Sequence, residues 1–476
     1  MSQLLVMKFG GTSMGSAERM KVAASICAEQ IRQRPVVTVV SAMSKVTDLL
    51  LDTLRKAEGD DQAALEANLK QLEDRHVITC AELLPADRQP AVLEQVHAII
   101  DDFRRIAQGI MMLGERPPRS VDEAVAVGER LSACLVAAYL ESVGIPAQAV
   151  NAAQVVVTDA VFGNATPLME ATRQKANNVL RPLIDSGVLP VVTGFNGATP
   201  DGRPTTLGRG GSDFSASILA AALDASELWI WTDVDGIMTA DPRLVPNAVV
   251  LPEVTYAEAA ELAYNGAKVL HPRTLAPLIE KGIPVWSKNS FALDKPGTKI
   301  LPSVNAPSGP RAVTSMANVA LVSIEPDSAE LSATLIMSRA LAALAQANAE
   351  LLALTSSSYR QSFCFLIRRD ELPHAMAALE TAFALELAHG YMKPFDVDEN
   401  VGLLAVVGEG MRGTPGLAGR IFTAISRERV NIIAIAQGSS ELTIAIVVRR
   451  EGLEKAVRAV HDECGLGKTP AASSKL

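Results

Sequence analysis

The sequence predicts an α/β protein built as a three-layer sandwich around a mostly parallel sheet, followed by two ferredoxin-like units of βαββαβ order. Short apolar runs alternate with helical patterns from residue 1 to about 300, which is typical of such a sandwich. A stretch rich in proline and serine interrupts the alternation at 301–312. Beyond it a strand and helix pattern occurs twice at an offset of about 80 residues, which indicates an internal repeat.

Five apolar runs are expected to form strands of the first domain, over residues 1–300. Several are continuous runs of valine and isoleucine, as in strands that helices cover on both faces. The expected strands are Leu4–Phe9, Val36–Ser41, Val188–Gly194, Leu228–Thr232 and Ile283–Trp286. Residues 48–140 carry heptad-like leucine and alanine spacing, which predicts a helical subregion attached to the sheet.

The repeat after the linker predicts one ferredoxin-like unit over 313–395, a second over 396–465 and a flexible tail over 466–476. Three pairs of apolar runs align between the halves, and each half holds a helix after its first strand and another after its last. The pairs are Val319–Ile324 with Val401–Val407, Leu351–Thr355 with Ile432–Ala436, and Phe363–Ile367 with Leu442–Val447. Such units can be packing modules, but their place after a catalytic domain favours regulatory ligand binding.

Composition narrows the classes of partner. The 476 residues carry a formal net charge of -9, and neither end holds a basic run, which argues against nucleic acid and anionic membrane. The longer apolar stretches, such as 131–140, are broken well before the roughly 20 residues that span a bilayer. Residues 1–7 lack a charged region typical of a signal peptide and lead directly into a glycine motif, so we expect a first strand.

The five cysteines are scattered, odd in number and never spaced as C-x-x-C. This pattern is typical of reduced thiols that act as small core residues or surface groups. A cytoplasmic location is therefore expected.

Two glycine-rich segments carry groups suited to phosphate chemistry. Lys8-Phe9-Gly10-Gly11-Thr12-Ser13 follows the first strand, and Leu207-Gly208-Arg209-Gly210-Gly211-Ser212-Asp213 opens an alanine-rich helix. Paired glycines let backbone N–H groups approach an anion closely, and helix N-termini direct such groups at phosphates. If the two turns face each other across the carboxyl edge of the sheet, they supply an ammonium, a guanidinium, a carboxylate and two backbone cradles. This combination predicts phosphoryl transfer.

Three further segments lie where an α/β sheet binds ligands. An expected strand ends at Thr232, and Asp233 and Asp235 follow it, which favours a nucleotide-contacting loop. Arg243 is positioned to reach a phosphate. A calcium loop is a weaker interpretation, because the third carboxylate and the distal glutamate are absent. The segments 41–47 and 127–133 add hydroxyls and the carboxylate of Glu129. These groups indicate a ligand site only when they are taken together with the glycine turns.

With these residues in view, the chain resembles the aspartokinases of the amino-acid kinase family over nearly its whole length. The likeness rests on seven segments and on two C-terminal units of the ACT type. The segments are KFGGTS (8–13), SAMSKVTD (41–48), GERLSA (128–133), TLGRGGSD (206–213), WTDVDGI (231–237), TADPR (239–243) and GAKVLHP (266–272). Kinases of glutamate, acetylglutamate, carbamate or UMP share the glycine-rich sheet but not this combination.

The resemblance implies transfer of the ATP γ-phosphoryl group to the β-carboxylate of L-aspartate, giving 4-phospho-L-aspartate, the first step towards lysine, threonine and methionine. Lys8 would stabilise the transferring phosphoryl group, and Asp213 would organise the site. The aspartate α-carboxylate would pair with Arg209. The α-ammonium would pair with Glu129, and Thr47 would hydrogen-bond the substrate. Gly210, Gly211 and Ser212 complete the implied substrate loop.

The same resemblance assigns ATP contacts to Lys8, Gly10, Gly11, Thr232, Asp233, Met238, Arg243, Lys268 and Val269. Position 238 is often tyrosine in relatives, so methionine there changes any contact that this tyrosine makes. Magnesium is expected to be held mainly by the ATP phosphates, with no dedicated metal residues. An aspartate carboxylate is already ionised at neutral pH, so no catalytic histidine is needed, and His271 is expected to cap or pack.

The C-terminal part resembles the regulatory region of threonine-sensitive aspartokinase–homoserine dehydrogenases, without the dehydrogenase half. Met411, Gly416, Asn431 and Gln437 are the implied effector residues, and threonine or lysine is the expected effector. The first unit departs from the pattern, because residues 324–330 replace a glycine-rich loop and Thr355 lies near the position equivalent to Gln437. A homo-oligomer through the ACT units is also implied.

Two other functions stay open from the sequence. A kinase of another small amino acid or carboxylate could use the same fold, but the pair Arg209 and Glu129 suits an α-amino acid and has no use with carbamate or UMP. An inactive amino-acid sensor could use the ACT units alone, but Lys8 and Asp213 argue against it.

Overall fold

The computed structural model describes residues 3–267, 270–305, 308–327, 332–357, 362–411, 414–438 and 442–467. The chain forms two compact units. The first comprises 1–237, 252–256 and 270–304, and the second comprises 238–251, 257–269 and 305–476. Unlike the predicted range 1–300, the first unit lacks 238–251 and 257–269. The physical reason is packing, because Ala240 and Val245 lie in the same hydrophobic core as Val313 and Leu404 of the second unit.

The first unit confirms the predicted α/β class, with a sheet of eight strands in the order β3-β4-β2-β1-β7-β9-β10-β8. All neighbouring pairs are parallel except β9 and β10. The strands are β1 (Leu5–Phe9), β2 (Val36–Val40), β3 (Ala147–Val150), β4 (Leu189–Thr193), β7 (Glu227–Thr232), β8 (Glu253–Thr255), β9 (Val285–Asn289) and β10 (Thr298–Leu301), with a separate hairpin of β5 (Asn196–Ala198) and β6 (Pro204–Thr206). Every residue of β1, β2 and β4 is buried, as predicted for strands covered on both faces.

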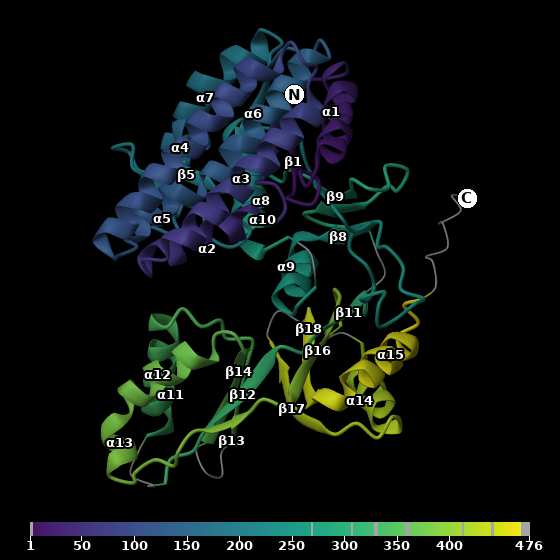
Figure 1. Cartoon of the computed structure of the whole chain (residues 1–476). Coiled ribbons are helices and arrows are strands. Elements are labelled where there is room, and N and C mark those ends of the chain that lie inside the picture. Colours follow the sequence, from purple (N-terminus) through teal and green to yellow (C-terminus); the bar gives the residue numbers. More distant parts are fainter. Residues whose placement is uncertain are drawn as a thin grey trace, which may run out of the picture. The chain divides into compact units, whose positions relative to one another are not determined.

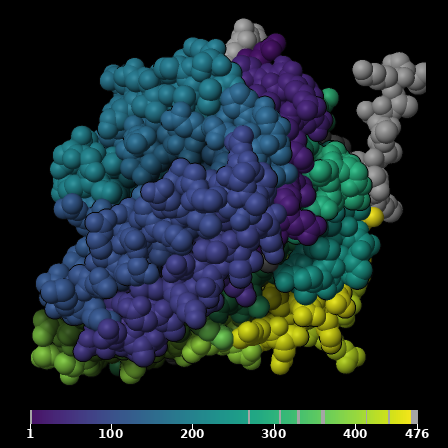
Figure 2. Space-filling view, turned by 45° about the horizontal axis from the view of Figure 1, so that its top comes forward, coloured from purple at the N-terminus to yellow at the C-terminus, as the bar shows by residue number. Residues whose placement is uncertain are grey.

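Helices fill the predicted helical subregion and cover the sheet (Figure 1). They are α1 (Ala17–Ile31), α2 (Val46–Glu58), α3 (Gln62–Leu83), α4 (Gln89–Leu113), α5 (Pro118–Val125), α6 (Val127–Ser142), α7 (Met169–Asp185), α8 (Gly211–Ala222) and α10 (Pro272–Ile279), with a 3-10 turn at Ala152–Gln154. Figure 2 shows the helices after residue 50 as a continuous blue surface on one face of this unit. Local chemistry sets their ends: Ser16 and Asp61 accept hydrogen bonds as N-caps of α1 and α3, and Gly114 ends α4 with a φ of 65°.

The second unit contains two four-stranded sheets, as the repeat predicts. One has the order β13-β14-β12-β15 and the other β11-β16-β18-β17. The strands are β11 (Ala312–Met316), β12 (Val319–Ile324), β13 (Ala353–Ser357), β14 (Ser362–Arg368), β15 (Asp396–Asp398), β16 (Val401–Val407), β17 (Ile432–Gln437) and β18 (Thr443–Arg449). The helices are α9 (Tyr256–Tyr264), α11 (Ala333–Gln346), α12 (Leu372–Ala382), α13 (Ala384–Ala388), α14 (Leu417–Arg427) and α15 (Leu453–Glu463), with a 3-10 turn at Arg450–Gly452.

The two ferredoxin-like units differ from the predicted ranges 313–395 and 396–465 by one strand each. Strand β11 pairs with β16 in the later sheet, and β15 pairs with β12 in the earlier one. The residues from β12 to β15 are thus inserted into a unit that begins with β11. Side chains from both sheets share one apolar cluster that includes Leu321, Leu403 and Val447, so the two sheets pack as a pair. In the described ranges, no helix has both the length and the apolar character needed to cross a membrane.

Candidate active site

The loops that follow five parallel strands are joined by hydrogen bonds at the carboxyl edge of the large sheet. The N–H of Gly10, after β1, donates to the Trp231 carbonyl of β7, and the N–H of Ser41, after β2, donates to the Phe9 carbonyl. After β4, Gly194 donates to Val40, and after β9, Ser290 donates to Thr232. Because these bonds cross from strand to strand, the first residues of neighbouring loops have fixed relative positions, as a preorganised site requires.

The two predicted glycine turns meet at this edge. Lys8 Nζ lies 2.5 Å from Asp213 Oδ1, and the two side chains are 10% and 22% exposed. The ammonium also lies over the glycine turn, since a Cβ added at Gly10 would be 3.4 Å from Nζ. The pair therefore places a cation, a carboxylate and the bare backbone of Gly10 in contact.

Helix α8 begins at the second turn without a side-chain cap. Gly210 precedes it with a φ of 70°, a conformation that favours glycine, so the first N–H groups of the helix are free of a capping side chain. Gly211 is the first residue of the helix and is packed tightly, because an added Cβ would be 2.6 Å from the ring of Phe195. Ser212 and Asp213 follow in the first turn and are half-buried. This end of α8 has the geometry of an anion-binding helix N-terminus.

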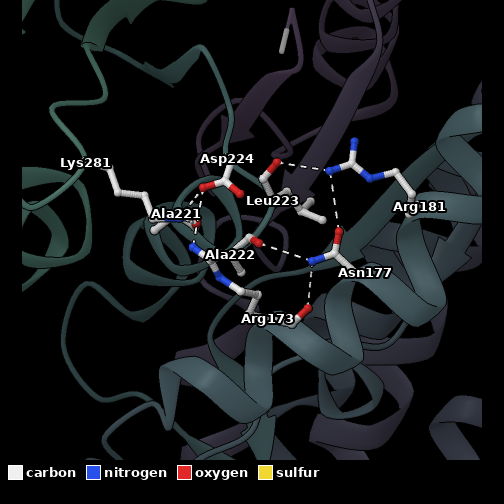
Figure 3. Close-up of polar contacts among 8 residues, drawn as sticks. All are labelled: Arg173, Asn177, Arg181, Ala221, Ala222, Leu223, Asp224 and Lys281. Carbon is white, nitrogen blue, oxygen red and sulfur yellow. Dashed lines mark hydrogen bonds and ion pairs between the residues drawn. The ribbon is translucent and has the colours of Figure 1, made fainter. Parts of the chain in front are cut away.

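The other end of α8 is fixed by side chains from α7 and from the turn after α10 (Figure 3). Asn177 Nδ2 donates to the Ala222 carbonyl at 3.4 Å, and Arg181 donates to the Leu223 carbonyl at 3.2 Å. Lys281 donates to the Ala221 carbonyl at 2.6 Å and also pairs with Asp224. Cations next to the last carbonyls complement the helix dipole, so α8 is held at the end opposite the site.

Glu129 is a buried carboxylate with an unfilled side. It lies in the first turn of α6, is 3% exposed, and its Oε2 has no hydrogen-bond partner. Burial raises the pKa of Glu129 to about 8, while the Ala42 N–H and the charge of Lys8 oppose the rise. Gly128 allows this close packing, because an added Cβ would be 2.8 Å from the Ala42 Cβ. A buried carboxylate near a lysine, with one oxygen lacking a hydrogen bond, is suited to receive an ammonium group of a ligand.

The remaining predicted substrate residues lie around the same edge. Thr47 is half-buried in the first turn of α2, which starts after Lys45 in a left-handed conformation with a φ of 65°. Arg209 is exposed between the two positive-φ glycines Gly208 and Gly210. The exposed guanidinium is thus carried on a turn whose backbone shape requires glycine on both sides.

The predicted nucleotide residues divide between the two units. In the first unit, Thr232 ends β7 and its hydroxyl donates to Asp233 at 3.2 Å, while Asp235 accepts from Asn289 at 2.6 Å. Met238 and Arg243 belong to the second unit. Met238 forms a bridge with Val250, and the exposed guanidinium of Arg243 pairs with Asp241 at 2.5 Å. Lys268 and Val269 lie outside the described residues.

Sequence reasoning missed Phe195, which the structure places against the site. Its φ of 71° is unusual for a bulky residue, its carbonyl accepts from Leu207, and its ring packs on Gly211. The sequence holds one indication, because Phe195 follows a buried strand and stands between Gly194 and Asn196-Gly197. His271 behaves as predicted: its ring accepts from the Arg273 N–H as N-cap of α10.

Among the residues with described positions, no group of three or more histidine, cysteine, aspartate or glutamate side chains could hold a metal ion.

The four predicted effector residues have different surroundings. Met411 is 3% exposed in the apolar core of the second unit, and Asn431 is exposed just before β17. Gly416 lines a shallow groove beside α14. Gln437 lines a cavity of about 620 Å³, whose wall also includes Thr355, the position that the repeat relates to it, together with Glu261, Asn265, Leu352 and Thr443.

Comparison with known proteins agrees with this geometry. Residues 3–289 match the model of the amino acid kinase family, and residues 404–464 match an ACT domain. The aspartokinase of Schizosaccharomyces pombe is 30% identical over 510 aligned residues, which cover 99% of this chain and 95% of the relative. The chain belongs to the aspartokinases of the amino acid kinase family.

Other aspartokinases share the whole fold. The structure of E. coli aspartokinase III in complex with aspartate and ADP is 29% identical and matches with a TM-score of 0.83, over 97% of this chain and 99% of that one. The complex with lysine and aspartate matches with a TM-score of 0.79. The bifunctional aspartokinase/homoserine dehydrogenase 1 of Arabidopsis thaliana is 35% identical over 98% of this chain but 52% of its own length. The chain thus spans about half the length of the bifunctional relatives it matches.

Proposed function

We propose that the protein transfers the γ-phosphoryl group of ATP to the β-carboxylate of L-aspartate. The observation that carries this proposal is the Lys8–Asp213 contact of 2.5 Å between two glycine turns. Beside it, the Glu129 carboxylate has one oxygen without a hydrogen bond and lies close enough to Lys8 to feel its charge. The first two supply phosphoryl-transfer chemistry, and the third supplies a site for an amino-acid ammonium group. Membership in the aspartokinases supports the choice of substrate.

In the proposed reaction, a β-carboxylate oxygen of aspartate attacks the γ-phosphorus, and the bond from that phosphorus to the bridging oxygen of ADP breaks. The products are 4-phospho-L-aspartate and ADP. The attacking carboxylate is already ionised, so no proton has to be removed. Lys8 would neutralise charge on the transferring group, and the first N–H groups of α8 would point at its oxygens. Asp213 would hold the Lys8 ammonium in place.

Substrate binding would divide between the two charged ends of the amino acid. Arg209 would form paired hydrogen bonds with the α-carboxylate, and Glu129 would accept the α-ammonium, with Thr47 as a further hydrogen-bond donor. Lys8, Gly10, Gly11, Thr232 and Asp233 would contact ATP from the first unit. The contacts expected of Met238, Arg243, Lys268 and Val269 stay predictions from the family resemblance. Mg²⁺ would screen the phosphate charges, bound mainly by their oxygens.

The proposal is tested by trapping aspartyl phosphate as its hydroxamate in the presence of ATP and Mg²⁺. Formation of the hydroxamate with aspartate, and not with glutamate, is the expected result. Turnover of another amino acid alone would assign the site to a different acceptor. No product with any amino acid would favour the sensor function.

We also propose feedback regulation by an amino acid through the ACT units. The support is the cavity of about 620 Å³ that is lined by both Gln437 and Thr355. An effector bound there would contact corresponding strands of the two ACT units. Adding threonine, lysine or both to the hydroxamate assay tests this proposal and identifies the effector. A homo-oligomer through the ACT units is proposed from the resemblance, and light scattering of the purified protein tests it.

A further inference from the structure

A buried carboxylate outside the proposed substrate contacts lies behind the loop that carries Arg209. Asp122, on the short helix α5, is 2% exposed. Its Oδ2 accepts the Gly163 N–H and the Thr206 N–H, both at 2.8 Å, and its Oδ1 accepts the Thr206 hydroxyl at 2.7 Å. Burying a carboxylate is unfavourable unless several donors satisfy it, and three hydrogen bonds do so here.

The bonds of Asp122 join three segments that are far apart in sequence. Helix α5 contributes the carboxylate, the segment 163–165 lies between β3 and α7, and Thr206 ends β6. Thr206 is also held from its other side, because its carbonyl accepts the Ala165 N–H at 2.8 Å. With its N–H, hydroxyl and carbonyl all bonded, Thr206 has little freedom to move.

Arg209 follows this fixed residue after Leu207 and Gly208. Leu207 is fully buried and its N–H donates to the Phe195 carbonyl at 2.9 Å. Gly208 has a φ of 75°, and an added Cβ would lie 2.7 Å from Asn164 Oδ1, so this turn rests against the segment that Asp122 binds. Arg273 donates to the same Asn164 amide oxygen and to the Ala165 carbonyl. Thr206 is therefore joined to Arg209 through one buried, hydrogen-bonded residue and one closely packed glycine.

We propose that Asp122 is a positioning residue for the amino-acid acceptor: its carboxylate fixes Thr206 and the segment 163–165, and so places the guanidinium of Arg209 for the substrate α-carboxylate. This inference rests on the proposed aspartate kinase activity and extends it to a residue that does not contact substrate. Displacement of a binding group by about 1 Å can cost up to about 10²-fold, so the effect is measurable.

The test compares four variants of the full chain by kcat, by KM for aspartate and ATP, and by thermal unfolding. Asp122→Ala removes all three bonds and is expected to raise the KM for aspartate about tenfold, with the KM for ATP within about twofold of the parent value. Asp122→Asn is expected to restore the parent KM, because the amide oxygen can accept both N–H groups while the Thr206 hydroxyl turns to accept from the amide nitrogen. Burial raises the pKa of Asp122, in keeping with a site that tolerates a neutral group.

Two further variants separate positioning from stability. Thr206→Val removes only the hydrogen bond of the hydroxyl and is expected to raise the KM for aspartate about threefold. It therefore tests the positioning role even if Asp122→Ala does not fold. Asn177→Ala is the matched control, since it removes part-buried hydrogen bonds at the opposite end of α8 and should lower the unfolding temperature without changing either KM.

The positioning role is overturned if Asp122→Ala or Thr206→Val lowers only the unfolding temperature, or if both KM values rise equally. It is also overturned if Asp122→Asn behaves like Asp122→Ala. Failure of the proposed function looks different, because the parent protein would then form no aspartyl phosphate, or Arg209→Ala would leave the KM for aspartate unchanged.

Discussion

Lys8 and Asp213 neutralise each other at the centre of the site, with Nζ and Oδ1 2.5 Å apart and both side chains largely shielded from solvent. Removing one partner leaves a poorly solvated charge and removes a group aimed at the phosphates. We expect Lys8→Ala and Asp213→Ala each to lower kcat by at least about 10²-fold. Steady-state kinetics measure the loss, and circular dichroism checks the fold.

Lys8→Met and Asp213→Asn keep the side-chain volume and serve as matched variants. A folded variant at either position with nearly normal kcat would contradict the proposed roles.

A change in the shape of the cation at position 209 tests whether it binds the aspartate α-carboxylate or the nucleotide. Arg209→Lys keeps the charge but loses the planar fork that binds a carboxylate through two parallel hydrogen bonds. We expect the KM for aspartate to rise about tenfold, the equivalent of one charged hydrogen bond, with a smaller change in the KM for ATP. A larger rise for ATP than for aspartate would assign Arg209 to the nucleotide instead.

Glu129 predicts a pH dependence. Its pKa is raised by burial from 4.5 to about 8, so the free enzyme carries a neutral Glu129 below that pH and an ionised one above it. An ionised carboxylate binds the substrate ammonium better, so kcat/KM for aspartate should rise with pH and level off above about 8. Glu129→Gln should flatten this rise, whereas an unchanged profile would show that another group titrates.

The same shift affects stability with the opposite sign. Between 4.5 and about 8 the folded protein keeps the Glu129 proton that the unfolded chain releases. The contribution of Glu129 to the free energy of unfolding therefore falls as pH rises through this window and is constant above it. Denaturant titrations of the parent protein and of Glu129→Gln at pH values across the window measure the difference, which should be largest at the alkaline end.

Gly194 is packed so closely on Ser212 that no side chain fits. An added Cβ would lie 2.7 Å from the Ser212 Cβ and 2.9 Å from its Oγ. Gly194→Ala should push the start of α8 outward, lowering stability by about 1–3 kcal/mol and kcat/KM by about tenfold or more. Gly109→Ala, in α4, is the control, because a Cβ there meets nothing within 4 Å. Equal behaviour of the two variants would refute the steric argument.

The effector cavity gives a prediction in which two residues of one motif behave differently. Gln437 lines the cavity and Asn431 does not. Gln437→Ala should raise the concentration of effector needed for half-inhibition by at least about fivefold while leaving uninhibited kcat unchanged. Asn431→Ala should be inhibited like the parent protein. If Asn431→Ala loses inhibition and Gln437→Ala keeps it, the effector binds elsewhere.

Much of this architecture could be predicted from sequence because local chemistry agrees with the fold. The valine-rich run at 36–40 is typical of a buried strand, and the paired glycines at 10–11 and 210–211 mark turns that meet where parallel strands end. The approach of Lys8 to Asp213 follows from that rule. His271 was expected to cap or to pack, and it is the N-cap of α10.

Other features depend on long-range packing that no local pattern records. Asp122 sits in an ordinary two-turn helix and becomes a three-bonded buried group only when Gly163 and Thr206 arrive beside it. Segment 238–251 looks continuous with the first domain, yet Ala240 and Val245 pack in the core of the second unit. The effector motif was grouped by resemblance, but Met411 packs in the core while Gln437 lines a cavity.

The strand exchange between the ferredoxin-like units has a consequence for synthesis on the ribosome. Strand β11 emerges before the whole inserted unit, yet β16, the strand it pairs with in the described part of the chain, is made after it. Until then β11 is an apolar segment with an unpaired edge, and the inserted unit can complete its sheet first because it contains all its own strands. Strand β11 can then pair with β16 across an inserted unit that is already folded. Because a folded insertion holds its two ends closer together than an unfolded one, less conformational entropy is lost when β11 and β16 meet. Nascent chains stalled just after β15 should therefore be the ones most in need of a chaperone.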